Sequence, residues 1–352
     1  MLFRKRFFKR IFFLLLAITS LLVLAYYLQP IKKGEGKDTL TRYQRVANWP
    51  ALPKEIKLGN PTGIAIDTNG QLIIFHRGSR RWPLIGAMPR SFIKEKTVLL
   101  IDPATGKLLS SWGDNMFIMP HGLKVDHENN IWVTDVGLHQ VFKFSHDGKL
   151  MLKLGEAGVA GRDSLHFNKP TDIAVAKDGS FYISDGYGNN RIMKFSSTGK
   201  YLFSWGQKGS GPGEFNIPHG IALDSSQHLY VADRENNRVQ VFSSSGKFIR
   251  QFKQSSFGTI GAVAFDQTGS RLFAVDDFTF LKIKHRGSDL FIFDTAGQVQ
   301  TRFGRSGGYD GPTAWYHDLA IDKEGNIYIG DILHNTIQKF RKSWESQQSQ
   351  KR

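Results

Sequence analysis

Three histidines occupy one repeated position of the chain, and their type and spacing favour a metal site. Each lies five residues before an aspartate, and the six equivalent positions are, in order, Thr62, His121, Thr171, His219, Gly261 and His317. Histidine thus falls in every second repeat, so a six-fold ring would set the imidazoles about 120° apart around its axis. Three imidazole ligands leave a fourth coordination position open, as in catalytic zinc sites.

The choice of metal follows from the ligand type. Imidazole is a poor ligand for calcium and magnesium, so the histidines favour zinc, while iron, copper and manganese stay open. A single histidine at the start of a strand is usually only hydrogen-bonded, and the Pro-His-Gly sequence around His121 and His219 is also consistent with inheritance between repeats. Strict alternation over six repeats favours metal binding over both explanations.

The elements that must position these histidines are short strands in six repeated units. Apolar alternations such as residues 229–231 and 239–242 are separated by Asp-Gly, Ser-Gly or Asn-Gly pairs, which predicts antiparallel hairpins. Three or four strands in about 40–60 residues make one propeller blade. The sequence therefore predicts an all-β, six-bladed β-propeller over residues 42–341. The last unit ends near Phe340, so residues 42–50 are expected to supply its outer strand and close the ring.

The two ends of the chain differ from the repeats in charge. The net charge is +16, of which residues 1–37 carry +7 and residues 341–352 carry +3. The basic start, residues 1–10, precedes an uncharged stretch at 11–28 that would span about 27 Å as a helix. We expect a transmembrane signal-anchor there, a stalk at 29–41 and a polar tail at 342–352, with the propeller on the extracytoplasmic side. A cleaved signal peptide is the alternative.

Other classes are less well supported by the composition. No nucleic-acid motif accompanies the positive charge, so nucleic-acid binding is not expected. The chain has no cysteine, which excludes disulfides and thiolate metal ligands but leaves the compartment open. A monomer is expected.

Several runs resemble the lyase domain of the peptide α-amidating enzymes, an NHL-repeat propeller family. They lie in order between residues 50 and 340 and include PHGL (120–123), WVTDVGLHQVFK (132–143), SDGYGNNRI (184–192), VADRENNRVQVF (231–242) and HDLAID (317–322). The NHL pattern of Asp, Asn and Arg is similar to Asp185, Asn189, Arg191 and to Asp233, Asn237, Arg238, for which we expect structural roles in the loops and between the strands.

The resemblance implies a chemistry and a set of residues. The family cleaves the C–N bond of a peptidyl-α-hydroxyglycine, a carbinolamide, to give an amide and glyoxylate. The implied residues are His121, His219 and His317 for zinc, Tyr187, Arg77 and Arg234 for catalysis, and Asp318 with the backbone carbonyls of Ile64 and Leu123 for a structural calcium. Zinc would lower the pKa of the substrate hydroxyl, a Tyr187 phenolate would act as base, and the arginines would hold the substrate carboxylate.

Each implied residue also has a simpler interpretation. Tyr187 lies in Gly-Tyr-Gly, where an exposed loop aromatic is common, and Arg234 would also suit an ion pair between blades. Arg77 precedes Arg80 and Arg81 and would also suit ordinary surface charge. The family's usual Met-Pro before the last histidine is replaced by Trp315-Tyr316, which leaves the substrate fit open.

Two other functions remain open from the sequence. One is a non-catalytic, membrane-tethered NHL propeller that binds or scaffolds other molecules. The other is a six-bladed calcium lactonase or related hydrolase, whose site would rest on axial carboxylates and asparagine rather than histidine. The favoured hypothesis is a zinc lyase whose substrate is a small molecule or peptide with an α-hydroxyglycine.

Overall fold

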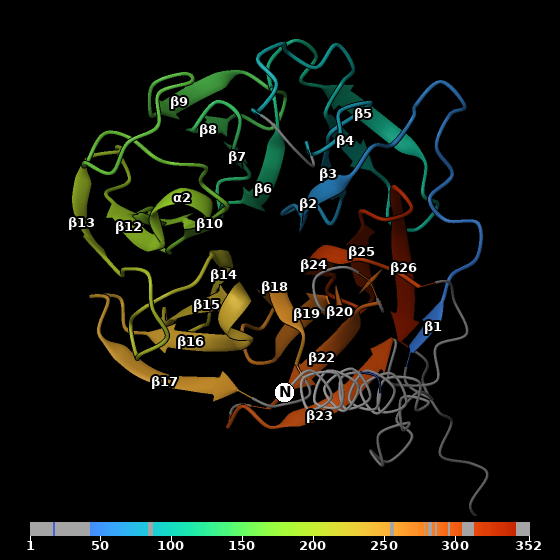
Figure 1. Ribbon diagram of the computed structural model, residues 1–352. Helices are drawn as coiled ribbons and strands as arrows, with labels where there is room; N and C mark the ends of the chain where they lie inside the picture. Colours follow the sequence, from blue (N-terminus) through green and yellow to red (C-terminus); the bar gives the residue numbers. More distant parts are fainter. Residues whose placement is uncertain are drawn as a thin grey trace, which may run out of the picture.

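The computed structural model describes residues 17, 43–83, 87–253, 257–277, 279–280, 284–285, 287–294, 296–304 and 313–342. In that part of the chain the strands form six four-stranded antiparallel sheets, arranged as a ring around a central axis (Figure 1). The predicted six-bladed propeller is therefore confirmed. The predicted basic start, transmembrane segment, stalk and polar tail lie outside the described residues, except for Ala17 and Lys342. Within the described ranges no helix is both long and apolar enough to cross a membrane.

The blades follow one another along the chain, each with its first strand nearest the axis. Blade 1 consists of β2 (Pro61–Ile66), β3 (Leu72–His76), β4 (Val98–Ile101) and β5 (Leu108–Trp112). Blade 2 consists of β6 (Pro120–Val125), β7 (Ile131–Asp135), β8 (Gln140–Phe144) and β9 (Leu150–Leu154). Blade 3 consists of β10 (Asp172–Val175), β11 (Phe181–Asp185), β12 (Arg191–Phe195) and β13 (Tyr201–Trp205).

The second half of the ring repeats this order. Blade 4 consists of β14 (Pro218–Leu223), β15 (Leu229–Asp233), β16 (Arg238–Phe242) and β17 (Phe248–Lys253). Blade 5 consists of β18 (Thr259–Phe265), β19 (Leu272–Asp277), β22 (Asp289–Phe293) and β23 (Val299–Gly304), and β20 (Thr279–Phe280) pairs with β21 (Lys284–His285) beside it. Blade 6 consists of β24 (Tyr316–Ile321), β25 (Ile327–Asp331), β26 (Thr336–Lys342) and β1 (Tyr43–Arg45).

A repeated aspartate shapes the turn after the inner strand in five of the six blades, and blade 3 has Ala176 at this position. In blade 2 the Asp126 carboxylate accepts hydrogen bonds from the backbone N–H groups of Glu128 and Asn130. This is the local pairing that makes aspartate a turn former. A register shift between Pro120 and Leu123 places a bulge at the start of β6. Because bulges bend a strand and redirect its side chains, the start of the inner strand can aim its residues at the axis.

The hydrophobic core lies between neighbouring blades. Trp132 and Val141 of blade 2 pack with Phe181 and Ile183 of blade 3, and the ring centroids of Trp132 and Phe181 are 4.5 Å apart. Replacing a large buried aromatic by alanine costs about 3–5 kcal/mol of stability. These contacts therefore hold neighbouring blades together.

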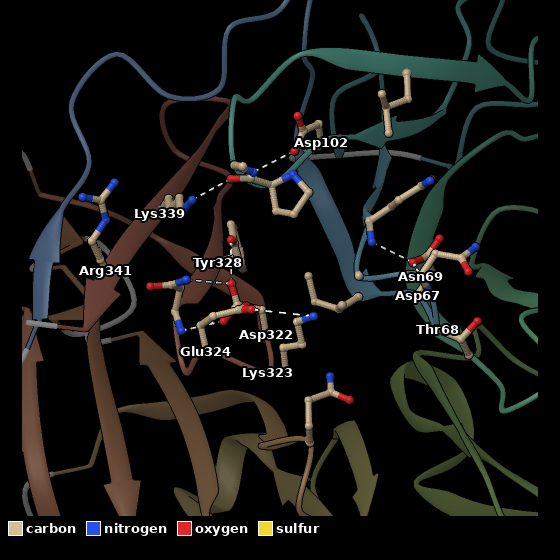
Figure 2. A pocket seen from close by; sticks show the side chains of 18 residues that line it. Asp67, Thr68, Asn69, Asp102, Asp322, Lys323, Glu324, Tyr328, Lys339 and Arg341 are labelled. Atoms are coloured by element: carbon tan, nitrogen blue, oxygen red, sulfur yellow. Dashed lines mark hydrogen bonds and ion pairs between the residues drawn. The ribbon is translucent and has the colours of Figure 1, made fainter.

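Blade 6 closes the ring, as the sequence predicted. Residue Tyr43 of β1 pairs with Lys342 of β26, and its ring stacks on Phe303 of blade 5 with centroids 5.8 Å apart. The ammonium of Lys339 on β26 donates to the carbonyl oxygen of Pro103 in blade 1, 2.6 Å away. Figure 2 shows Lys339 reaching across this junction toward the turn that begins at Asp102. The ring is thus closed by a sheet that joins both ends of the propeller and by direct contacts between blades 6 and 1, of which Lys339 to Pro103 is one.

The NHL pattern has the structural role expected of it, with one correction. Asp185 accepts hydrogen bonds from Asn189 Nδ2 at 2.6 Å and Arg191 Nε at 2.9 Å. In blade 4 the asparagine that bonds to the aspartate is Asn236, not Asn237, because Asn237 ends the short turn in the left-handed region with φ of 53°.

Candidate metal centre

The three predicted histidines meet on the axis of the propeller. His121, His219 and His317 are the second residues of the inner strands of blades 2, 4 and 6, and each is at most 9% exposed. Their ring centroids lie 4.7, 4.8 and 5.0 Å apart, so they form a nearly equilateral triangle. One nitrogen from each ring lies within 4.8 Å of the other two. Among the described residues this is the cluster that can hold a metal ion.

The intervening blades fix the orientation of each imidazole. The Nδ1 atoms of His121, His219 and His317 lie 2.7, 2.6 and 2.9 Å from backbone carbonyl oxygens. The residues that supply these oxygens are, in the same order, Thr171, Gly261 and Thr62. A carbonyl oxygen only accepts, so each Nδ1 carries the proton and each Nε2 keeps its lone pair. A hydrogen bond from Nδ1–H to a carbonyl oxygen is typical of histidines that bind a metal through Nε2.

The histidines are also held neutral. Burial lowers the pKa of His219 to about 3, and the positive charge of Arg234 acts in the same direction. Burial likewise lowers the pKa values of His121 and His317 well below the usual 6.5, and the neighbouring histidines add to the effect. Neutral imidazole is the form that binds metals. The residues present therefore fit a metal ion at neutral pH.

Tyr187 lies directly beside two of the ligands. It belongs to α2 (Gly186–Asn189), a single turn after β11. Its hydroxyl oxygen is 3.1 Å from Nε2 of His121 and 3.1 Å from Nε2 of His219. Burial raises the pKa of Tyr187, while Arg234 and Arg77 oppose that shift. The side chain is half-buried and is not an ordinary exposed loop aromatic.

Both predicted arginines line the cavity above the histidines. Arg77 is only 3% exposed, and its Nε donates to the carbonyl oxygen of Pro120 at 3.0 Å. Burial lowers its pKa to about 10, so it stays charged at neutral pH. Arg234 is half-buried and pairs with the carboxylate of the adjacent Glu235 at 3.8 Å. Arg77 is therefore not surface charge, and the ion pair of Arg234 lies within one blade rather than between blades.

This cavity has a volume of about 590 Å³ and combines charged and apolar walls. Tyr187, His219 and His317 line it together with both arginines. Trp82, which the sequence analysis did not single out, packs on Tyr187 with centroids 5.2 Å apart and carries the Arg77 guanidinium 5.2 Å above its ring. Trp82 lies six residues after His76, beyond a run of basic residues, and no repeated pattern in the sequence indicates that it lines the cavity.

The two residues that depart from the family pattern have different positions. Trp315 lines the cavity and its backbone N–H donates to Asp331 at 3.0 Å. Tyr316 is 1% exposed, belongs to the core between blades 5 and 6, and donates its hydroxyl to Gln338. Both residues line the cavity, but the side chain of Tyr316 is packed in the core, so the half-buried Trp315 is the better placed of the two to touch a substrate.

A larger cavity of about 740 Å³ lies at the junction of blades 1 and 6 (Figure 2). Its walls are turn residues such as Asp67, Asp102 and Glu324, and of the described residues that line it none belongs to the histidine cluster. The smaller cavity on the axis is therefore the candidate active site.

Comparison with known proteins supports the propeller fold and its repeats. The NHL repeat family model matches residues 117–144, 167–195 and 215–242, which are the inner three strands of blades 2, 3 and 4. The solved structure of a streptogramin B lyase covers 86% of this chain with a TM-score of 0.53 at 15% identity. At that identity the likeness concerns the fold alone.

Two curated relatives are much closer in sequence. The chain is 37% identical over 342 residues to peptidyl-glycine alpha-amidating monooxygenase B of Xenopus laevis, with 91% of this chain and 38% of the relative covered. It is 37% identical over 338 residues to peptidyl-alpha-hydroxyglycine alpha-amidating lyase 1 of Drosophila melanogaster, with 83% of this chain and 58% of the relative covered. The chain thus spans about two fifths of the amphibian relative.

Proposed function

The chain belongs to the family of the peptidyl-α-hydroxyglycine α-amidating lyases, and on this premise we propose that it is a zinc-dependent carbon–nitrogen lyase. Its substrate would be a peptidyl-α-hydroxyglycine, and its products a peptide amide and glyoxylate. The observation that carries the proposal is the Tyr187 hydroxyl, 3.1 Å from Nε2 of both His121 and His219 in a cavity that Arg77 and Arg234 also line.

The metal would be held by Nε2 of the three axial histidines. Three neutral nitrogen ligands with an open fourth position support zinc. When bound, the ion would supply Lewis acidity at the substrate hydroxyl, which lowers the pKa of that hydroxyl.

Tyr187 is the proposed proton carrier. In the metal-free protein its O–H has the lone pairs of two histidine nitrogens as acceptors. Coordination would engage those lone pairs and leave the phenol oxygen to face the substrate. As the C–N bond breaks and the carbonyl of glyoxylate forms, the hydroxyl proton is lost and the amide nitrogen gains one. Tyr187 Oη can accept the first proton and return one to nitrogen, so that no net proton is consumed.

The arginines are proposed to hold the carboxylate of the hydroxyglycine. They occupy the same repeat position in blades 1 and 4, directly after the last residues of β3 and β15, His76 and Asp233. Both line the cavity from opposite blades. Charge-assisted contacts from two sides would fix the substrate with its hydroxyl toward the histidines.

The test is glyoxylate release from a short α-hydroxyglycine peptide by the full-length chain, stripped of metal and then reloaded with zinc. We expect one zinc per chain and activity that a chelator removes. The His219→Ala variant should lose activity on the order of 10³-fold, since the metal contributes several kcal/mol. The control is His228→Ala, a histidine outside the cavity that pairs with Asp224. A folded, zinc-loaded protein without activity would leave the non-catalytic NHL propeller as the better hypothesis.

We also propose that the propeller is held at the extracytoplasmic face of a membrane. The support is the sequence alone: basic residues 4–10 followed by the uncharged stretch 11–28. Protease digestion of intact cells or spheroplasts tests it, because an extracytoplasmic propeller would be cut without breaking the membrane.

A further inference from the structure

Two carboxylates face the axis beneath the histidines, and the proposed reaction does not use them. Asp172 and Asp318 stand directly after the axial position in blades 3 and 6, where the other four blades have Gly63, Gly122, Gly220 and Ala262. Blades 3 and 6 are opposite each other in the ring (Figure 1). Both aspartates are at most 5% exposed. Two buried negative charges at opposite blades need a positive partner, because an uncompensated buried charge is costly.

Each aspartate is engaged by the next blade through one oxygen only. Oδ2 of Asp172 accepts the backbone N–H of Ile221 at 2.9 Å, and Oδ2 of Asp318 accepts that of Ile64 at 2.8 Å. The Oδ1 atom of each carboxylate is buried and accepts no hydrogen bond from the described residues. The two carboxylates can therefore still interact with a cation that lies between them.

A single lysine supplies that cation. Three positions after the axial residue, five blades carry alanine and one carries lysine: Ala65, Lys124, Ala174, Ala222, Ala264 and Ala320. The small alanines leave room for one long side chain at the axis. Nζ of Lys124 lies 3.2 Å from Oδ2 of Asp172 and 3.8 Å from Oδ1 of Asp318. Its side chain is 19% exposed, toward a cavity of about 270 Å³ at the other end of the axis.

We propose that the Lys124 ammonium is the structural cation of this channel and takes the place of the predicted calcium. The donors expected for calcium do not fit a second cation well. Asp318 already accepts the Ile64 amide and faces the ammonium, and a dication bound to Asp318 would lie within a few ångströms of a like charge. A covalently attached cation links blades 2, 3 and 6 at every calcium concentration, whereas a bound ion stabilises only when it is present.

Calcium titration of the zinc-loaded, full-length protein tests this directly. The measurements are the melting temperature and terbium luminescence, from calcium-free buffer to about 10 mM calcium, which exceeds the weakest dissociation constants of protein calcium sites. We expect the melting temperature of the native chain to stay constant within about 1 °C. Calcium-dependent stabilisation or a terbium signal in the native chain would overturn the proposal, whether or not the protein releases glyoxylate.

Removal of the ammonium should convert the channel into a calcium site. Lys124→Ser should melt at a lower temperature in calcium-free buffer and recover with calcium but not with sodium. The matched control is Lys143→Ser, whose lysine pairs with Asp126 at 3.2 Å and is similarly shielded, with 15% of the side chain exposed. That variant should gain no calcium response. If Lys124→Ser folds only with calcium, the result supports the proposal that the Lys124 ammonium takes the place of calcium. A lowered melting temperature that calcium does not restore contradicts that proposal.

Discussion

The Nδ1 atom of His121 lies 2.7 Å from the carbonyl oxygen of Thr171, which occupies the same repeat position in the next blade. The same relationship joins His219 to Gly261 and His317 to Thr62. Blades that lack the histidine therefore supply the acceptor that orients it. All six copies of the position contribute to the centre, three through imidazoles and three through the backbone.

Close packing of the inner strands should control metal affinity. A Cβ atom on Gly122 would lie 2.5 Å from the Thr171 carbonyl oxygen, so Gly122→Ala must displace the acceptor of His121. We expect zinc affinity to fall by about 10–100-fold, the usual effect of losing the hydrogen-bond acceptor that orients a metal-binding histidine. Zinc competition with a chromophoric chelator measures it. The control is Gly261→Ala, where a Cβ would meet nothing closer than 3.7 Å. Equal zinc affinities in the two variants would show that the close packing of Gly122 against Thr171 does not control metal binding.

The hydroxyl of Tyr187 should affect turnover rather than metal binding. We expect Tyr187→Phe to keep its zinc and its fold but to lose about 10²–10⁴-fold in kcat, the usual contribution of a general acid or base. Tyr201→Phe serves as the control, since Tyr201 is a half-buried tyrosine of the same blade whose hydroxyl bonds to Ser204. Steady-state glyoxylate release and zinc content are measured together. Full activity of Tyr187→Phe would remove the phenol from the mechanism.

Arg234 should act mainly on substrate affinity. A hydrogen bond to a charged group contributes about 1.5–3 kcal/mol, so Arg234→Gln should raise KM by about 10–100-fold with a smaller change in kcat. The measurement compares the hydroxyglycine substrate with its methyl ester, which lacks the carboxylate charge. Arg250→Gln in the outer strand β17 is the control. If the ester is as sensitive to Arg234→Gln as the acid, the arginine does not bind the carboxylate.

Stability at mildly acidic pH should depend on His76. Its Nδ1 accepts the backbone N–H groups of Gly59 and Gly78, and burial lowers its pKa to about 4. The unfolded chain protonates this histidine below about pH 6.5 while the folded chain does not. Its contribution is therefore complete above pH 6.5 and is lost progressively as the pH falls toward 4, by up to about 1.4 kcal/mol per pH unit.

The comparison uses His76→Gln, whose side-chain oxygen can still accept both amides. Urea unfolding at pH 7.5 and 5.5 should show a smaller loss of stability in the variant than in the native chain. Identical losses would place the pH dependence in other groups.

The fold was predictable because its signals are local and repeated. The turn aspartate, such as Asp126, recurs in five of the six units and the apolar alternations recur in all of them. The number of blades and the pairing of residues 42–50 with the last unit therefore followed from counting strands. The three axial histidines were predictable for the same reason, since an equivalent position in a closed ring must face the axis. Tyr187, Arg77 and Arg234 were assigned through family resemblance, and the structure places all three around the histidines.

Contacts that cross between blades were not predictable in the same way. Nothing in the local sequence of Lys124 indicates that its ammonium reaches Asp172 in the next blade and Asp318 two blades away in the other direction. The row of five alanines at the equivalent position was the available signal. The packing of Trp82 on Tyr187 likewise depends on how two loops from different blades approach each other, which neither sequence periodicity nor turn chemistry determines.

The pairing of β1 with β26 has a mechanical consequence. Tyr43 lies opposite Lys342, so the two ends of the described propeller leave the same end of one short antiparallel pair. A pulling force applied between them would load the hydrogen bonds one after another, as in opening a zipper, rather than all at once as in shear. The β1–β26 pair would be the first part of the ring to separate. The tension would reach the metal-binding axis only after blade 6 had lost its outer strand.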